Sequence, residues 1–197
     1  MNDVTPRIAA IRAALAASAE LRVLPPATID AVTAFEARLG IGLPPAYRRF
    51  VLEVCEGIEQ YEEPQLYTLA QIEALCASDA IDPKRPFPYG DVDAAALRRA
   101  LASLPANSSV FDNAAFMALQ KRGGTNGALT VAGNGGNDFS VLVVTGEQRG
   151  WMWRTGELDH PEPGGLYDSD TDAPLDFIAW FCLWAPSGLG VTVAEQD

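Results

Sequence analysis

The 197-residue chain has 48% hydrophobic and 20% charged residues and a net charge of −12, a composition typical of globular proteins. Its length suits one domain with a sizeable core, and because no run of about 18 uncharged apolar residues occurs, no membrane span is expected. The acidity is uneven, since residues 1–49 carry a net +2 and residues 50–197 a net −14. Such a surface argues against nucleic-acid binding; it either keeps the protein in solution or attracts a basic partner.

The N-terminal segment and the cysteines predict a cytoplasmic protein. The stretch "AALAAS" is too short and too weakly apolar for the core of a signal peptide. Cys55, Cys76 and Cys182 are far apart and odd in number. They indicate reduced thiols rather than a disulfide framework.

Two helices are expected in the first 40 residues. Thr5 provides a capping hydroxyl for the first, with Pro6 at its first helical position. The second follows a Thr28 cap and ends at Gly40, because glycine adopts the left-handed conformation that closes a helix.

A third helix follows directly, and it explains the double proline in "IGLPPAYRRF". Proline is excluded from helix interiors but can start a helix, so we predict a joint in which one helix ends at Gly40 and the next begins at Pro44. Apolar residues then recur at helical spacing, which makes the second and third helices a hairpin: Tyr47, Phe50, Val51 and Val54.

The middle of the chain contains shorter elements. A strand is expected over Gln65–Tyr67, and Thr68 with Gln71 forms a capping-box pattern for a helix near Leu69–Ala77. The prolines of residues 82–91 predict a loop. Residues 93–104 and 113–119 are interpreted as short helices, and residues 121–127 as a turn.

From residue 128 the pattern changes to strands, expected at 128–132, 139–144 and 150–153. The glycine-rich residues 133–138 are interpreted as a strand connection or bulge, and residues 145–150 as a hairpin-like turn. An acidic loop is predicted over Glu157–Asp176. A closing helix is predicted over residues 174–185, capped by Asp172 just before Pro174.

Little in the chain indicates catalysis or metal binding. The single histidine, His160, is predicted to be an exposed loop residue, and the cysteines lack zinc-site spacing. "DSDTD", residues 168–172, begins like a calcium loop, but Ala173 and Ala179 occupy the positions that need glycine and glutamate. The glycine-rich segment fails both phosphate-loop templates. We therefore expect no enzyme activity, no cofactor and no metal.

Two other features leave alternatives open. Paired carboxylates can perform acid–base chemistry, but adjacency is expected by chance among 26 acidic residues. Trp151 and Trp153 alternate on a strand and so share a face, either as part of the core, which is favoured, or as a platform for a small ligand.

The order of elements, helices followed by a meander of strands and a packing helix, predicts an α+β fold. We expect a single domain over residues 26–185, with a mixed or antiparallel sheet packed by the helical hairpin and the C-terminal helix. Residues 1–25 are expected to form a helical extension and residues 186–197 a tail.

The segment "FEARLGIGLPPAYRRFVLEVCEG" resembles the signature of the SUKH superfamily and, within it, the Smi/Knr family. "CEG" stands where the family pattern has Asn-Gly-Gly, although Gly57 is retained. "RPFP" at residues 85–88, the strand region ending at Trp153 and the closing helix resemble later parts of the family. The signature matches at Phe35, Glu36, Leu39, Gly40, Leu43, Pro44, Tyr47 and Phe50.

The resemblance implies a non-catalytic α+β binding protein. Bacterial members of the family are regarded as immunity proteins that bind and block toxin domains, often nucleases, and eukaryotic members act as regulatory scaffolds. The family supplies no catalytic residues, and toxin contacts differ between its members. The signature positions are expected to make the fold.

We therefore expect a cytoplasmic immunity protein with a basic, nuclease-type toxin domain as its partner. The alternative is a regulatory or scaffolding module without a toxin partner, and the oligomeric state is left open. The acidic segments are the predicted binding surfaces: Glu157, Asp159, Glu162, Asp168, Asp170 and Asp172 in one, and Glu59, Glu62 and Glu63 in the other.

Overall fold

The computed structural model describes residues 4–59, 65–91, 93, 95–96, 99, 103, 125–136, 138–157 and 160–193. The helices are α1 (Thr5–Ala17), α2 (Ile29–Leu39), α3 (Pro45–Glu53), α4 (Leu69–Ser78) and α7 (Phe177–Gly188). The strands are β1 (Arg22–Val23), β2 (Ile58–Glu59), β3 (Gln65–Leu66), β4 (Ala128–Gly135), β5 (Asp138–Val143), β6 (Met152–Glu157) and β7 (His160–Gly165). The helices predicted over 93–104 and 113–119 fall mostly outside the described residues.

The strands form one seven-stranded sheet in which spatial order follows chain order from β1 to β7. Each neighbouring pair is antiparallel. The pairing of β4 with β5 shifts register between Gly133 and Gly135, so the glycine-rich segment is the predicted bulge and connection. The α+β fold expected from the sequence is confirmed, with an antiparallel sheet.

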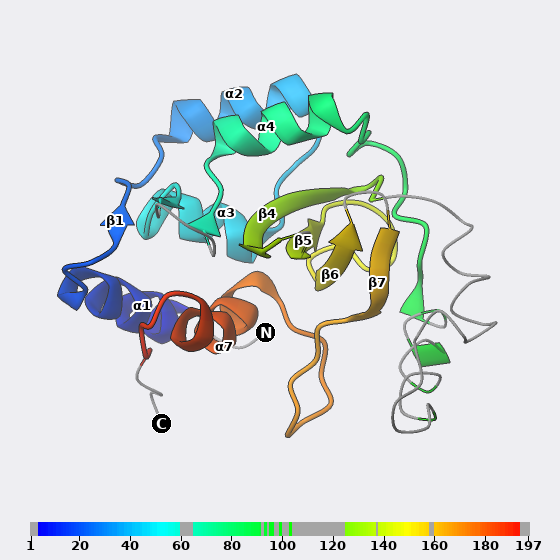
Figure 1. Ribbon diagram of the computed structural model, residues 1–197. Helices are drawn as coiled ribbons and strands as arrows, with labels where there is room; N and C mark the ends of the chain where they lie inside the picture. The colour runs from blue at the N-terminus through cyan, green and yellow to red at the C-terminus, as the bar shows by residue number, and fades with distance from the viewer. Residues whose placement is uncertain are drawn as a thin grey trace.

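Helices lie on both sides of the sheet (Figure 1). The main core is the larger of two clusters of buried hydrophobic residues. The helices α2 and α4 lie side by side above the sheet, and α1 and α7 lie below. Successive strand residues point to opposite faces, so Leu142 and Met152 enter the main core. Val141 and Trp153 instead join a second cluster with Phe87. The sheet therefore has a core on each face.

The predicted helix ends are largely confirmed. The Thr28 hydroxyl accepts a hydrogen bond from the Ala31 N–H at 3.2 Å, and Gly40 has a φ of 66°. The capping box of Thr68 and Gln71 is present at the start of α4. The Thr5 cap is wrong, because Val4 is the N-cap and Thr5 is already helical.

Two predictions for the C-terminal part are wrong. Residues 157–176 are not one loop, because they contain the end of β6 and all of β7. The prolines of β7 concealed it, yet an edge strand tolerates proline because one side of its backbone needs no partner. Asp176, rather than Asp172, caps α7 by accepting the Ala179 N–H at 2.8 Å, and Asp172 has a φ of 59°.

The first helix belongs to the main core. Ile8, Ile11 and Leu15 are buried in it, and α1 packs against α7. Among the described residues, no helix combines the length and the apolarity needed to cross a membrane.

Candidate partner-binding surface

The joint between α2 and α3 is held by charged side chains from two directions. The Glu36 carboxylate accepts hydrogen bonds from the Leu43 N–H at 2.9 Å and from Arg48 Nε at 3.2 Å. Arg149, in the turn after β5, donates through Nη2 to the carbonyl oxygens of Gly42 at 3.1 Å and Leu43 at 3.2 Å. The double proline therefore sits in a braced turn, and Arg149 is a contributor that the sequence did not reveal.

Most residues of the signature lie in the core. Rings on α3 pack against rings on α7, with centroid distances of 4.7 Å for Tyr47 and Phe177 and 4.9 Å for Phe50 and Phe181. Leu39 is half-buried, and Gly40 is the left-handed residue that closes α2. The fully or nearly buried members are Phe35, Leu43, Pro44, Tyr47, Phe50 and Trp153.

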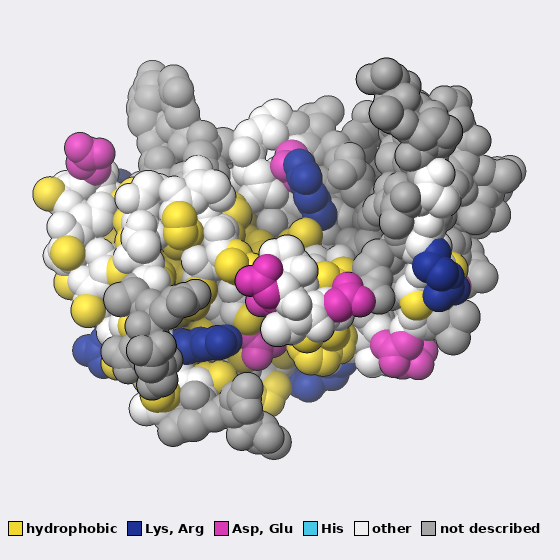
Figure 2. Space-filling view, turned by 90° about the horizontal axis from the view of Figure 1, so that it is seen from below, with side chains coloured by type: hydrophobic (Ala, Val, Ile, Leu, Met, Phe, Trp, Pro, Cys, Tyr) yellow, Lys and Arg dark blue, Asp and Glu magenta, His cyan; other side chains and the backbone are white. Residues whose placement is uncertain are grey.

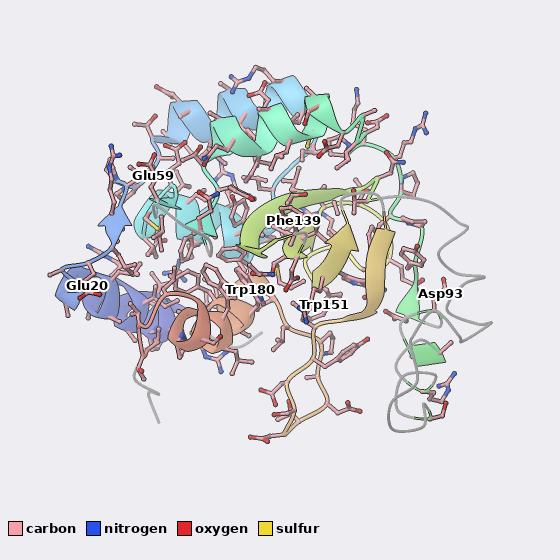
Figure 3. All side chains as sticks on the ribbon, in the orientation of Figure 1. Glu20, Glu59, Asp93, Phe139, Trp151 and Trp180 are labelled. Atoms are coloured by element: carbon pink, nitrogen blue, oxygen red, sulfur yellow. The ribbon has the colours of Figure 1, made fainter. Side chains whose placement is uncertain are left out.

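Trp153 is a core residue and not an exposed platform. Its ring centroid lies 5.1 Å from that of Phe87 and 5.4 Å from that of Tyr89, and its side chain is fully buried. The "RPFP" segment thus covers the second face of the sheet. Trp151 is half-buried, forms a bridge with Asp176 and lies at the base of the projecting acidic loop (Figure 3).

From here on, the name acidic loop refers to residues 166–173, which project from the body between β7 and α7 (Figure 1). A bridge between Tyr167 and Pro174 closes its base. The Asp168 carboxylate accepts hydrogen bonds from the N–H groups of Asp170 and Thr171, at 2.9 Å and 2.8 Å, and from the Thr171 hydroxyl at 3.0 Å. These bonds, those from Thr171 first, lower the pKa of Asp168 below its ordinary value. Asp168 is therefore ionised at neutral pH and orders the loop through these bonds.

The other two aspartates of the loop, Asp170 and Asp172, are exposed. In the view from below, acidic side chains of the loop stand at the centre of the molecular face (Figure 2). The loop thus presents its charge to solvent from a backbone held by internal hydrogen bonds, an arrangement suited to meeting a basic protein surface.

The second predicted acidic segment differs in both place and pairing. Glu59 forms an ion pair with Arg22 at 2.6 Å, and Glu53 forms one with Arg49 at 2.7 Å. Glu59 lies on the side of the molecule away from the projecting loop (Figure 3). The fold therefore does not bring the two acidic segments together.

The remaining predicted contact residues lie either in β6 and β7 or outside the residues that the structure describes. Glu157 ends β6 and Glu162 lies in β7, which His160 begins. Asp159, Glu62 and Glu63 lie outside the described residues. Of the predicted set, Asp168, Asp170 and Asp172 form the compact acidic surface.

The described residues show neither a cluster of metal ligands nor a reactive thiol at Cys55 or Cys76. Within the described ranges, no group of three or more histidine, cysteine or acidic side chains is arranged to hold a metal ion. Burial raises the pKa of the Cys55 thiol to about 12 and that of Cys76 to about 11. Both thiols are therefore protonated near neutral pH, the unreactive form.

Comparison with known proteins gives one family. The SMI1 / KNR4 family (SUKH-1) matches the chain over residues 26–169. No curated protein matches the chain. The matched range contains the braced joint, the strands β2 to β7 and the start of the acidic loop.

Proposed function

The chain belongs to the SMI1 / KNR4 family (SUKH-1), and from this premise we propose that it is a cytoplasmic, non-catalytic immunity protein. Its partner is a basic toxin domain, of the nuclease type, that it binds and neutralises. The observation that carries this proposal is the ordered acidic loop, with Asp170 and Asp172 exposed on a turn held by Asp168.

The charge of the whole protein supports the same partner. A nuclease carries basic surface because it must bind a phosphate backbone. A protein with a net charge of −12 attracts such a surface over distance and accelerates the encounter. An acidic loop that occupies the basic substrate groove also competes directly with nucleic acid.

The proposal is tested by affinity capture. The tagged full-length protein is incubated with lysate of its native organism, and the retained proteins are identified by mass spectrometry at low and at moderate salt. We expect a basic, nuclease-type domain that is retained less well as salt rises, because screening weakens exposed charge pairs.

Two results would contradict the proposal. Retention of signalling or envelope proteins without a toxin domain would indicate a regulatory scaffold instead. Retention of no protein at either salt concentration would remove the basis for a macromolecular partner.

A further inference from the structure

The C-terminal helix α7 lacks the polar outer face that surface helices usually have. Its sequence, "FIAWFCLWAPSG", contains no charged residue. By contrast, α2 carries Asp30, Glu36 and Arg38. A helix that is apolar all round is normally buried on all sides, yet α7 lies at the surface beside α1 (Figure 1).

The outward side of α7 is an apolar stripe, defined by Ala179, Cys182, Leu183 and Pro186. These positions follow helical i, i+3, i+4 and i+7 spacing, so they share one face. Leu183 is 55% exposed, Pro186 is exposed, and Ala179 and Cys182 are half-buried. The stripe runs for about 10 Å along the helix axis. The opposite side of α7 is buried in the main core.

The stripe also offers a hydrogen-bond acceptor. Pro186 lies inside α7 and has no N–H to donate to the carbonyl group of Cys182, four residues earlier. This carbonyl therefore lacks its usual helical donor, next to the exposed Leu183. An arginine or lysine side chain of a partner is a suitable donor for it.

The stripe and the acidic loop are neighbours. Only Pro174, Leu175 and Asp176 separate the loop from α7 in the chain. Arg7 of α1 lies close enough to both features to act on their titrating groups. It adds to the lowering of the Asp168 pKa, which is mainly due to hydrogen bonds from Thr171. It also opposes the rise that burial causes in the pKa of Cys182.

The apolar stripe and the acidic loop together suit one kind of binding partner. Protein interfaces have an apolar centre and a polar rim, and here hydrophobic side chains lie beside the acidic loop on one molecular face (Figure 2). A second copy of the chain is disfavoured because each copy carries a net charge of −12. A basic protein, by contrast, is attracted by this negative charge.

Resting on the proposed function, we propose that the stripe of α7 is the apolar centre of the partner interface and that the acidic loop is its charged rim. The partner presents an apolar side chain flanked by lysine or arginine. Leu183 is the anchor that enters the partner surface.

Site-specific photo-crosslinking tests this proposal. The photoreactive residue p-benzoylphenylalanine replaces Leu183 in one full-length variant and Ile29 in a control variant. Ile29 is 52% exposed and begins α2, on the opposite side of the molecule (Figure 1). Each variant is checked for its fold by circular dichroism, mixed with native lysate and irradiated, and the adducts are identified.

We expect an adduct with a basic protein from position 183 and none from position 29. An adduct only from position 29, or none from either position while affinity capture succeeds, would overturn this surface and leave the proposed function intact. An adduct between two copies of the chain would identify α7 as a self-association face and also overturn the proposal. Failure of both capture and crosslinking would remove the proposed function as well.

A substitution gives a second measure that does not depend on crosslinking. Leu183→Glu should weaken the affinity for the captured basic domain about tenfold or more, as expected for an interface anchor. The matched Ile29→Glu variant should bind like the unmodified protein. Equal affinities for the two variants would exclude Leu183 as an anchor.

Discussion

The braced joint and the acidic loop both depend on carboxylates, but they use them in opposite ways. At the joint, Glu36 is turned inward to the Leu43 N–H and to Arg48. In the loop, the Asp168 carboxylate accepts hydrogen bonds from N–H groups of the turn. Asp170 and Asp172 are exposed to solvent. A carboxylate bonded to the backbone of its own fold contributes to stability, whereas for one displayed on an ordered turn we propose a role in recognition.

This contrast separates substitutions that unfold the protein from those that affect binding. Changes at the joint and in the core beneath it should reduce the free energy of unfolding. Changes at the solvent-facing side chains of the loop and of the outer face of α7 should act mainly on the partner.

The largest effect on stability is expected for Phe50→Ala. Phe50 is fully buried and packs against Phe177 and Phe181 of α7, so its removal should cost about 3–5 kcal/mol. Urea unfolding followed by tryptophan fluorescence measures the change. Leu183→Ala, on the exposed side of α7, is the control and should change stability by less than about 0.5 kcal/mol. Equal losses for the two variants would contradict the division of α7 into a core face and a surface face.

A smaller loss is expected for Glu36→Ala. The substitution removes a charged acceptor from the half-buried joint and leaves the Leu43 N–H without it, at a cost of about 1.5–3 kcal/mol. Glu59→Ala breaks the exposed pair with Arg22 and should cost about 0–1 kcal/mol. Parallel urea titrations compare the two. A Glu36→Ala variant as stable as Glu59→Ala would show that the joint does not depend on this carboxylate.

Charge reversal on the loop should chiefly affect the rate of association. The double variant Asp170→Lys with Asp172→Lys is expected to bind the captured basic domain about tenfold more slowly at low salt, with a weaker dependence on salt. Surface plasmon resonance over a salt series measures this rate. The control, Asp30→Lys with Glu59→Lys, makes the same change in net charge away from the loop. If both double variants slow association equally, only the total charge matters and the loop is not a contact.

The smallest effect concerns the titration of Asp168. Carbon-13 NMR should find its pKa below the ordinary aspartate value, and Thr171→Val should raise that pKa because it removes the hydroxyl donor. A lowered pKa in the folded state stabilises the fold above the unfolded pKa, and this contribution disappears as pH falls through the folded pKa. An ordinary pKa, unchanged by Thr171→Val, would mean that the loop is not ordered by Asp168.

Sequence patterns predicted those elements whose determinants are local. Thr28, Gly40 and the pair of Thr68 and Gln71 fix helix ends through contacts within a few residues, and all three predictions are confirmed. The wrong predictions are two helix caps, Thr5 and Asp172, and the missed strand β7. β7 exists because β6 pairs with it, although Pro161 argues locally against a strand. The two-residue strands β1 and β2 are too short to show any periodicity.

For the candidate surface, the sequence did not reveal the contacts that depend on three-dimensional structure. The acidic loop was visible as a cluster of charges, but its internal hydrogen bonds needed the positions of Asp168 and Thr171 in space. The brace from Arg149 spans more than a hundred residues of chain, so no local signal indicated it. The apolar outer face of α7 had a signal, since twelve consecutive uncharged residues at a surface helix are unusual, but only the structure shows which side is exposed.

Inhibition measured directly tests the central claim that this protein neutralises a basic toxin. The captured domain is purified, and its activity on nucleic acid is followed as the full-length protein is added up to and beyond equimolar concentration. We predict that activity is lost at one protein per toxin domain and returns at high salt, where the complex dissociates. A domain that stays fully active while saturated with the protein would contradict the immunity function and indicate a scaffold.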